Sequence, residues 1–190
     1  MYAATQILRK EHDAILRMID ATEQTARKLD RGAAVPAEVL SNLQEFFQLF
    51  ADRCHHGKEE DLLFPLLEKK GLPRIGGPVG VMLMEHEEGR ALVRTMAEAA
   101  KAYANGSREA GTKWAGAARK YAELLRQHIM KENEVLFVMT ERLLSDEEQN
   151  KLAAAFETLE QEKMGRGTHE RLHAMMEKLL AEVLPVKAPH

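Results

Sequence analysis

The amino-acid sequence predicts an all-α fold: an antiparallel up-down-up-down four-helix bundle with two additional C-terminal helices. Four long segments repeat apolar residues at steps of three and four, which is the spacing of one helix face. The 12 glycines and 6 prolines among 190 residues are too few for a fold of many short strands, and aromatic residues make up only 5%. Because short or medium loops join the long segments, successive helices are expected to run antiparallel.

Six segments are expected to be helical, and they cover residues 3–29, 37–70, 79–104, 112–143, 146–164 and 168–183. In the first segment, Leu8, His12 and Ile15 fall on one helix face. The second ends at Lys69-Lys70-Gly71, where lysines suit the negative end of the helix dipole and glycine suits the position after the helix. Pro65, near the end of this segment, predicts a kink.

Turn-forming residues separate the later helices. The stretch 71–80 holds four glycines and two prolines, and it predicts a loop before the third helix. Asn105-Gly106-Ser107 ends the third helix, and Gly165-Arg166-Gly167 separates the fifth from the sixth. Ser145 and Glu148 have the spacing of a capping box, which indicates that the fifth helix begins there.

Length, charge and cysteine content limit the class of protein. The length fits one domain, in which residues 1–143 form the bundle and 144–190 form a helical extension packed on it. A net charge of −3 without a block of five like charges argues against nucleic acid or an anionic membrane surface as partner. The sequence has no signal-like start and no apolar run of about 18 residues, and its single cysteine, Cys54, cannot form an internal disulfide. We therefore expect a cytoplasmic protein that binds a small ligand.

The sequence contains an internal repeat. Residues 55–64 and 128–137 are identical at five of ten positions, and both begin with a His-x-x-x-Glu unit. Glu11-His12-Asp13 likewise corresponds to Glu85-His86-Glu87, at a nearly equal distance before each unit. The repeat predicts two related helical hairpins. In each hairpin the imidazole and the carboxylate of the His-x-x-x-Glu unit lie on one face of a helix and point in the same direction.

The repeat also distinguishes between two overlapping pairs. Both His55/Glu59 and His56/Glu60 have the four-residue spacing, but only the first aligns with His128/Glu132. His56 is therefore expected to face solvent or a neighbouring loop. The predicted cluster comprises four histidines and two glutamates, namely His12, His55, Glu59, His86, His128 and Glu132.

A pair of cations explains why such a set would be buried together. Unpaired charges in an apolar core cost several kcal/mol each. Two divalent ions would more than offset the negative charge of the two carboxylates, and a mixture of imidazole and carboxylate suits iron, manganese or zinc. An isolated His-x-x-x-Glu pair is expected by chance in a chain this rich in glutamate, so the prediction depends on the repeat.

Several further residues have two open interpretations. Gly89 leaves room either for a small ligand or for close helix packing, and Tyr121 either donates to the site or belongs to the core. For Cys54 a core position is favoured over metal ligation. Four residues near the C-terminal helices are weighed as surface groups or as additions to the site: His169, His173, Glu160 and Glu162.

The combined pattern resembles the hemerythrin-like HHE cation-binding domains over roughly residues 1–142. It consists of His12, His55-x-x-x-Glu59, Glu85-His86-Glu87 and His128-x-x-x-Glu132. The resemblance implies a four-helix bundle with a non-haem di-iron centre, in which the four histidines are terminal ligands and the two glutamates are bridges. Arg90 stands where oxygen-carrying members have a further histidine, so the sequence is more similar to the branch with four histidines and two glutamates.

That branch includes proteins linked to nitric oxide, peroxide and the repair of iron centres. We therefore expect two iron ions, replaceable by zinc or manganese, that bind or react with dioxygen, nitric oxide or peroxide in a stress response, with an unknown electron donor. The alternative is an iron-storage, iron-sensing or repair protein without turnover, and a third reading is a purely structural helical module. The sequence leaves open whether the chain is an enzyme and whether it forms a homodimer.

Overall fold

The computed structural model describes residues 3–165 and 167–184, and every regular element in these ranges is a helix. The all-α prediction is therefore confirmed for this part of the chain. The helices, including three π-helical stretches, are α1 (Ala3–Asp30), α2 (Ala37–Phe46), η1 (Phe47–His56), η2 (Glu59–Leu63), α3 (Phe64–Lys69), α4 (Pro78–Ala104), α5 (Arg108–Lys131), η3 (Glu132–Leu136), α6 (Phe137–Leu143), α7 (Asp146–Met164) and α8 (Thr168–Val183).

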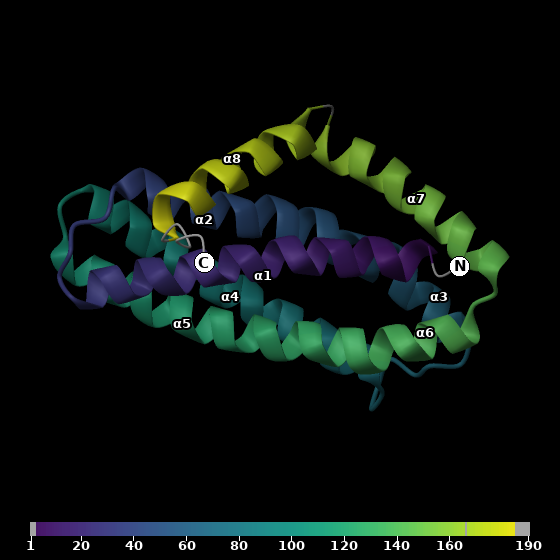
Figure 1. Cartoon of the computed structure of the whole chain (residues 1–190). Coiled ribbons are helices and arrows are strands. Elements are labelled where there is room, and N and C mark those ends of the chain that lie inside the picture. Colours follow the sequence, from purple (N-terminus) through teal and green to yellow (C-terminus); the bar gives the residue numbers. More distant parts are fainter. Residues whose placement is uncertain (1–2, 166, 185–190) are drawn as a thin grey trace, which may run out of the picture.

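Four long rods lie side by side, and α7 and α8 pass over them (Figure 1). The rods are α1, the run from α2 to α3, α4, and the run from α5 to α6. The fourth rod begins at Arg108, four residues earlier than predicted, because the Ser107 side chain accepts a hydrogen bond from the Ala110 amide and caps the helix. None of the helices among the described residues is long and apolar enough to cross a membrane.

Two of the rods contain π-helical stretches at the predicted ligands. His55 lies in η1, Glu59 begins η2 and Glu132 begins η3. A π-helical turn bonds each residue to the fifth one along the chain, is rare, and occurs frequently at functional sites. Pro65 lies in the first turn of α3, where its missing amide hydrogen costs little. The periodicity of the sequence did not indicate these π-helical turns.

The apolar core has two clusters, and α8 contributes to one of them and α7 to the other. One cluster contains Trp114 and Phe47 together with Leu172 of α8, and the other contains Phe137 together with Phe156 of α7. The predicted capping box is present at the start of α7. Between the clusters lies a layer of buried polar side chains, which includes all six residues predicted to form the site.

Candidate metal centre

The six predicted residues come together inside the bundle. They are contributed by all four rods, and none is more than 1% exposed: His12, His55, Glu59, His86, His128 and Glu132. Their ligand atoms fall into two neighbouring groups. We call the group around His12 and His55 position 1, and the group around His86 and His128 position 2.

Each position contains two imidazoles whose Nε2 atoms face each other. The two Nε2 atoms are 2.9 Å apart for His12 and His55, and 3.1 Å apart for His86 and His128. Metal–nitrogen distances in proteins are about 2.0–2.1 Å, so one ion can contact both nitrogens of a pair.

The Nδ1 atom of every one of these histidines has an oxygen partner. His55 Nδ1 is 2.8 Å from Glu11 Oε2, and His128 Nδ1 is 2.9 Å from Glu85 Oε2. The corresponding distances are 2.6 Å from His86 to Glu60 Oε1 and 3.0 Å from His12 to Asn133 Oδ1. A neutral imidazole that donates through Nδ1 presents its Nε2 lone pair to the interior, as metal-binding histidines do.

The two glutamates span both positions. Glu132 Oε2 lies 3.1 Å from His12 Nε2 and 3.3 Å from His128 Nε2. Glu59 directs Oε1 to within 3.7 Å of His55 Nε2 and Oε2 to within 3.5 Å of His86 Nε2. None of the four carboxylate oxygens makes a hydrogen bond of normal geometry, although all are buried. Buried acceptors without donors, next to converging imidazole lone pairs, fit a pair of cations.

Burial and neighbouring charge affect the titration of these groups differently. Burial, reinforced by the nearby Glu132, raises the pKa of Glu59 well above its usual value. Burial also acts to raise the pKa of Glu132, but His128 and His12 outweigh it and the pKa is lowered. Burial lowers the pKa of His55 to about 4, so this imidazole is neutral and available as a ligand at neutral pH.

A second layer of charges holds the orienting carboxylates in place. Lys58, which is only 1% exposed, donates to Glu11 and to Glu160 Oε2, the latter at 2.7 Å. Lys131 donates to Glu85 in the equivalent place. No role was assigned from the sequence to Lys58, Lys131, Glu11 or Glu85. The repeat nevertheless aligns Lys58 with Lys131 and Glu11 with Glu85. The repeat was therefore the signal that could have found them.

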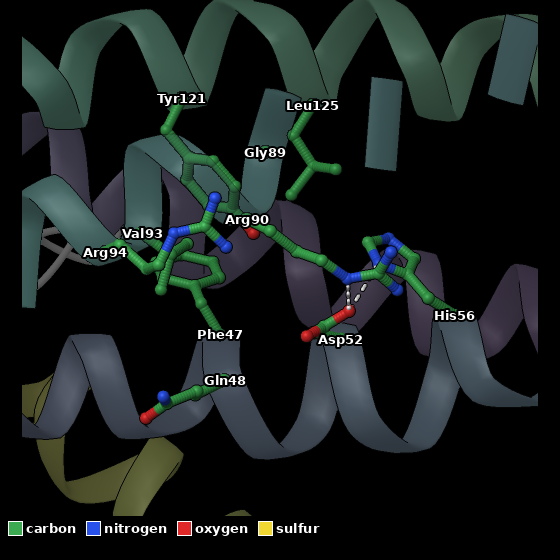
Figure 2. A pocket seen from close by; sticks show the side chains of 10 residues that line it. All are labelled: Phe47, Gln48, Asp52, His56, Gly89, Arg90, Val93, Arg94, Tyr121 and Leu125. Atoms are coloured by element: carbon green, nitrogen blue, oxygen red, sulfur yellow. Dashed lines mark hydrogen bonds and ion pairs between the residues drawn. The ribbon is translucent and has the colours of Figure 1, made fainter. Parts of the chain in front are cut away.

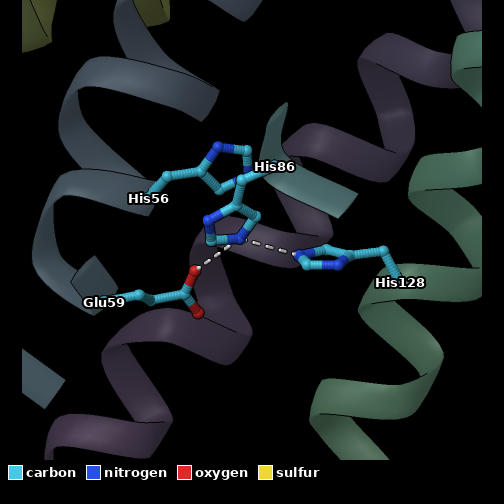
Figure 3. Close-up of side chains that lie close together, drawn as sticks. All are labelled: His56, Glu59, His86 and His128. Carbon is cyan, nitrogen blue, oxygen red and sulfur yellow. Dashed lines mark hydrogen bonds and ion pairs between the residues drawn. The ribbon is translucent and has the colours of Figure 1, made fainter. Parts of the chain in front are cut away.

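The predicted orientation of His56 was wrong. This side chain is buried and its ring stacks on that of His86, with centroids 3.8 Å apart and an interplanar angle of 14° (Figure 3). The physical reason is the π-helical stretch η1, in which the angle between successive side chains differs from that of an α-helix. Both His55 and His56 therefore face the interior.

The structure places the remaining candidates as follows. Glu160 reaches the site's outer layer through Lys58, whereas Glu162 is exposed and His173 lies at the surface against Phe50. The side chain of His169 lies outside what the structure describes. Cys54 is a buried free thiol, in agreement with a core position.

A small cavity adjoins position 2. It has a volume of about 190 Å³, and its wall includes His56, Gly89, Tyr121 and Arg90 (Figure 2). A methyl group at Gly89 would come 3.4 Å from the ring of Tyr121, so this glycine permits close packing and also lines the cavity. Tyr121 is a core side chain at the cavity wall. Gly89 therefore packs closely against Tyr121, and the interpretation that it leaves room for a small ligand stays a prediction.

These observations define the class of protein: a helical protein with a buried cluster of histidines and glutamates able to hold metal ions. The family model of the hemerythrin HHE cation binding domain matches residues 3–140, and the chain belongs to this family. The resemblance predicted from the motif is therefore confirmed.

The chain is also similar to two curated mycobacterial proteins. Uncharacterized protein Rv1995 of Mycobacterium tuberculosis and uncharacterized protein Mb2018 of Mycobacterium bovis are each 25% identical to it over 162 residues. These alignments cover 85% of this chain and 63% of each relative. The chain thus spans less than two thirds of the length of these relatives.

Proposed function

We propose that this chain is a non-haem di-iron protein that binds or reacts with dioxygen, nitric oxide or peroxide on an antiparallel up-down-up-down bundle. The observation that carries the proposal is the pair of Nε2–Nε2 contacts, at 2.9 and 3.1 Å, spanned by the carboxylates of Glu59 and Glu132. The proposed ligands are the six buried residues of positions 1 and 2. Zinc or manganese would suit the same donor set.

The protein's own contribution is orientation and exclusion of water. Glu11, Glu60 and Glu85 hold the Nδ1 side of three imidazoles, so each Nε2 lone pair points inward. The bound iron pair would supply the redox chemistry. The cavity beside His56, with Phe47 and Val93 in its wall, has room for a small neutral molecule.

Metal analysis tests this proposal directly. Protein produced in iron-rich medium and purified without chelator is expected to hold about two irons per chain and to absorb in the near ultraviolet when oxidised. Glu59→Ala and Glu132→Ala should each abolish the paired centre, because each removes a group shared by both positions. Glu162→Ala, at an exposed carboxylate, is the matched control and should retain two irons. A wild-type chain that holds one ion or none would contradict the proposal.

Iron sensing without turnover is a second candidate, and one observation favours it. Glu160 of α7 bonds to Lys58, which bonds to Glu11, the partner of His55. The C-terminal helices therefore contact the surroundings of position 1 and can respond to its occupancy. Consumption assays separate the two functions: turnover of peroxide or nitric oxide above that of free iron supports the reactive protein, and its absence supports a sensing, storage or repair protein.

The reactive function requires an electron donor, which we propose to be a separate cytoplasmic component. The single cysteine fits a reducing compartment.

A further inference from the structure

We propose that His56 is a fifth histidine ligand, and that it completes position 2 together with His86, His128 and Glu59. The inference rests on the proposed function, because it assumes that metal ions occupy the two positions. It adds a residue that the aligned motif does not contain, and it makes the two positions chemically different.

The first observation is the placement of His56. One ligand atom from each of His56, Glu59, His86 and His128 lies within 4.8 Å of all the others (Figure 3). All four side chains are buried. Glu59 also belongs to the group of position 1. Its carboxylate is therefore shared between position 1 and the group that contains His56, His86 and His128.

The second observation is the hydrogen bonding of the His56 ring. Its Nδ1 lies 3.4 Å from Asp52 Oδ1, and Arg90 holds that carboxylate through Nε at 2.8 Å. Its Nε2 is buried and has no hydrogen-bond partner. The four histidines of positions 1 and 2 show the same arrangement, with Nδ1 on an oxygen and Nε2 towards the interior.

An unpartnered buried nitrogen destabilises the protein unless something binds it. Stacking on His86 accounts for the position of the ring but leaves Nε2 without a partner. A metal ion in position 2 would supply that partner once the His56 ring turns out of its stack on His86, because two rings only 14° from parallel cannot direct their in-plane lone pairs at one ion.

The third observation comes from the internal repeat. The residue that aligns with His56 in the second half is Ile129, which is buried in the apolar core. An apolar side chain therefore satisfies the packing at this place in the repeat, and packing alone does not require an imidazole. His56 gives position 2 three imidazoles, whereas position 1 has two, from His12 and His55. Two ions should therefore bind with unequal affinity.

The test is a titration of the metal-free protein with Co²⁺, followed by visible absorption and by competition with a chromophoric chelator. Wild type is expected to bind two ions in distinguishable steps. His56→Ile, which installs the residue of the repeat, should weaken one step by at least about 10- to 100-fold, the loss caused even by removing a group that only orients a ligand. The same variant should change the d–d spectrum of that ion and leave the other step unaltered. His173→Ala, at a surface histidine, is the control and should match wild type.

Chemical rescue provides a second readout. His56→Ala opens space next to the existing cavity of about 190 Å³, through which free imidazole can reach position 2. Added imidazole should restore the weakened step in His56→Ala and should not affect wild type. Circular dichroism of both metal-free variants checks that they are folded.

Two wild-type-like binding steps in His56→Ile, with an unchanged spectrum, would overturn the assignment of His56 and leave the proposed function intact. Failure of the wild-type chain itself to bind two ions would instead overturn the proposed function.

Discussion

Replacing Glu59 with leucine should stabilise the metal-free protein and destabilise the metal-loaded one. Both carboxylate oxygens of Glu59 are buried without a hydrogen bond, and burial together with the nearby Glu132 raises the pKa of this group, which favours its neutral form. The metal-free protein therefore contains a buried polar group without a hydrogen bond of normal geometry. Leucine removes this group and also removes the carboxylate shared by positions 1 and 2.

The expected magnitudes follow from these contacts. A buried polar group without a partner costs about 1–3 kcal/mol, so the metal-free Glu59→Leu variant should gain stability of that order. With metal, wild type gains about 2.7 kcal/mol for each site at a free-ion concentration 100 times Kd. The variant loses this gain, so the sign of its effect on the free energy of unfolding reverses when metal is added.

Urea unfolding followed by circular dichroism measures both effects, once after chelator treatment and once with saturating metal ions. Glu132→Leu is the matched control. Glu132 Oε2 lies 3.1 Å from His12 Nε2 and 3.3 Å from His128 Nε2, and the lowered pKa of Glu132 indicates that the charged form is favoured. Its removal should therefore destabilise the metal-free protein. If Glu59→Leu and Glu132→Leu both destabilised the metal-free protein by similar amounts, the reasoning would be refuted.

Three further predictions follow from the surroundings of the site. Glu60→Ala should retain two ions at saturation but weaken metal binding about 10- to 100-fold, because Glu60 orients His86 and is not among the proposed ligands. Isothermal titration calorimetry measures the loss of affinity. An unchanged affinity would contradict this role of Glu60. Metal affinity should fall as pH decreases, because ligand histidines must be neutral. The pKa of His128 is raised, because Glu132 and Glu85 outweigh the opposing effect of burial, so protonation of His128 should begin the loss. Protonation of His55, whose pKa burial lowers to about 4, should complete it, and occupancy retained below pH 4 would be inconsistent with histidine ligation. Cys54 is buried, and burial raises the pKa of its thiol to about 12. The thiol should therefore resist thiol reagents at pH 8 until the protein is unfolded. Rapid labelling of the folded protein would show instead that the thiol is accessible.

Local regularities explain how much could be predicted from the sequence. The helical segments follow from apolar periodicity, and the six site residues follow from the repeat, because a four-residue spacing places imidazole and carboxylate on one face of the same helix. Even the orienting pairs Glu11 with Lys58 and Glu85 with Lys131 were present in the aligned repeat. They were not recognised because each pair joins two different rods, and their contact depends on how those rods are rotated.

The tertiary structure alone decided the surroundings of each ligand. Asn133 lies directly after Glu132 in the chain yet orients His12 on another rod, and Glu160 of α7 reaches Lys58 across 102 residues. His56 faces the interior because η1 departs from the α-helical spacing that sequence periodicity assumes. The sequence by itself determined which helix faces carry the proposed ligands, since that depends on spacing within one helix. Packing between the rods determined which groups orient the proposed ligands and which additional imidazole lies beside them, since that depends on the register and rotation of separate helices.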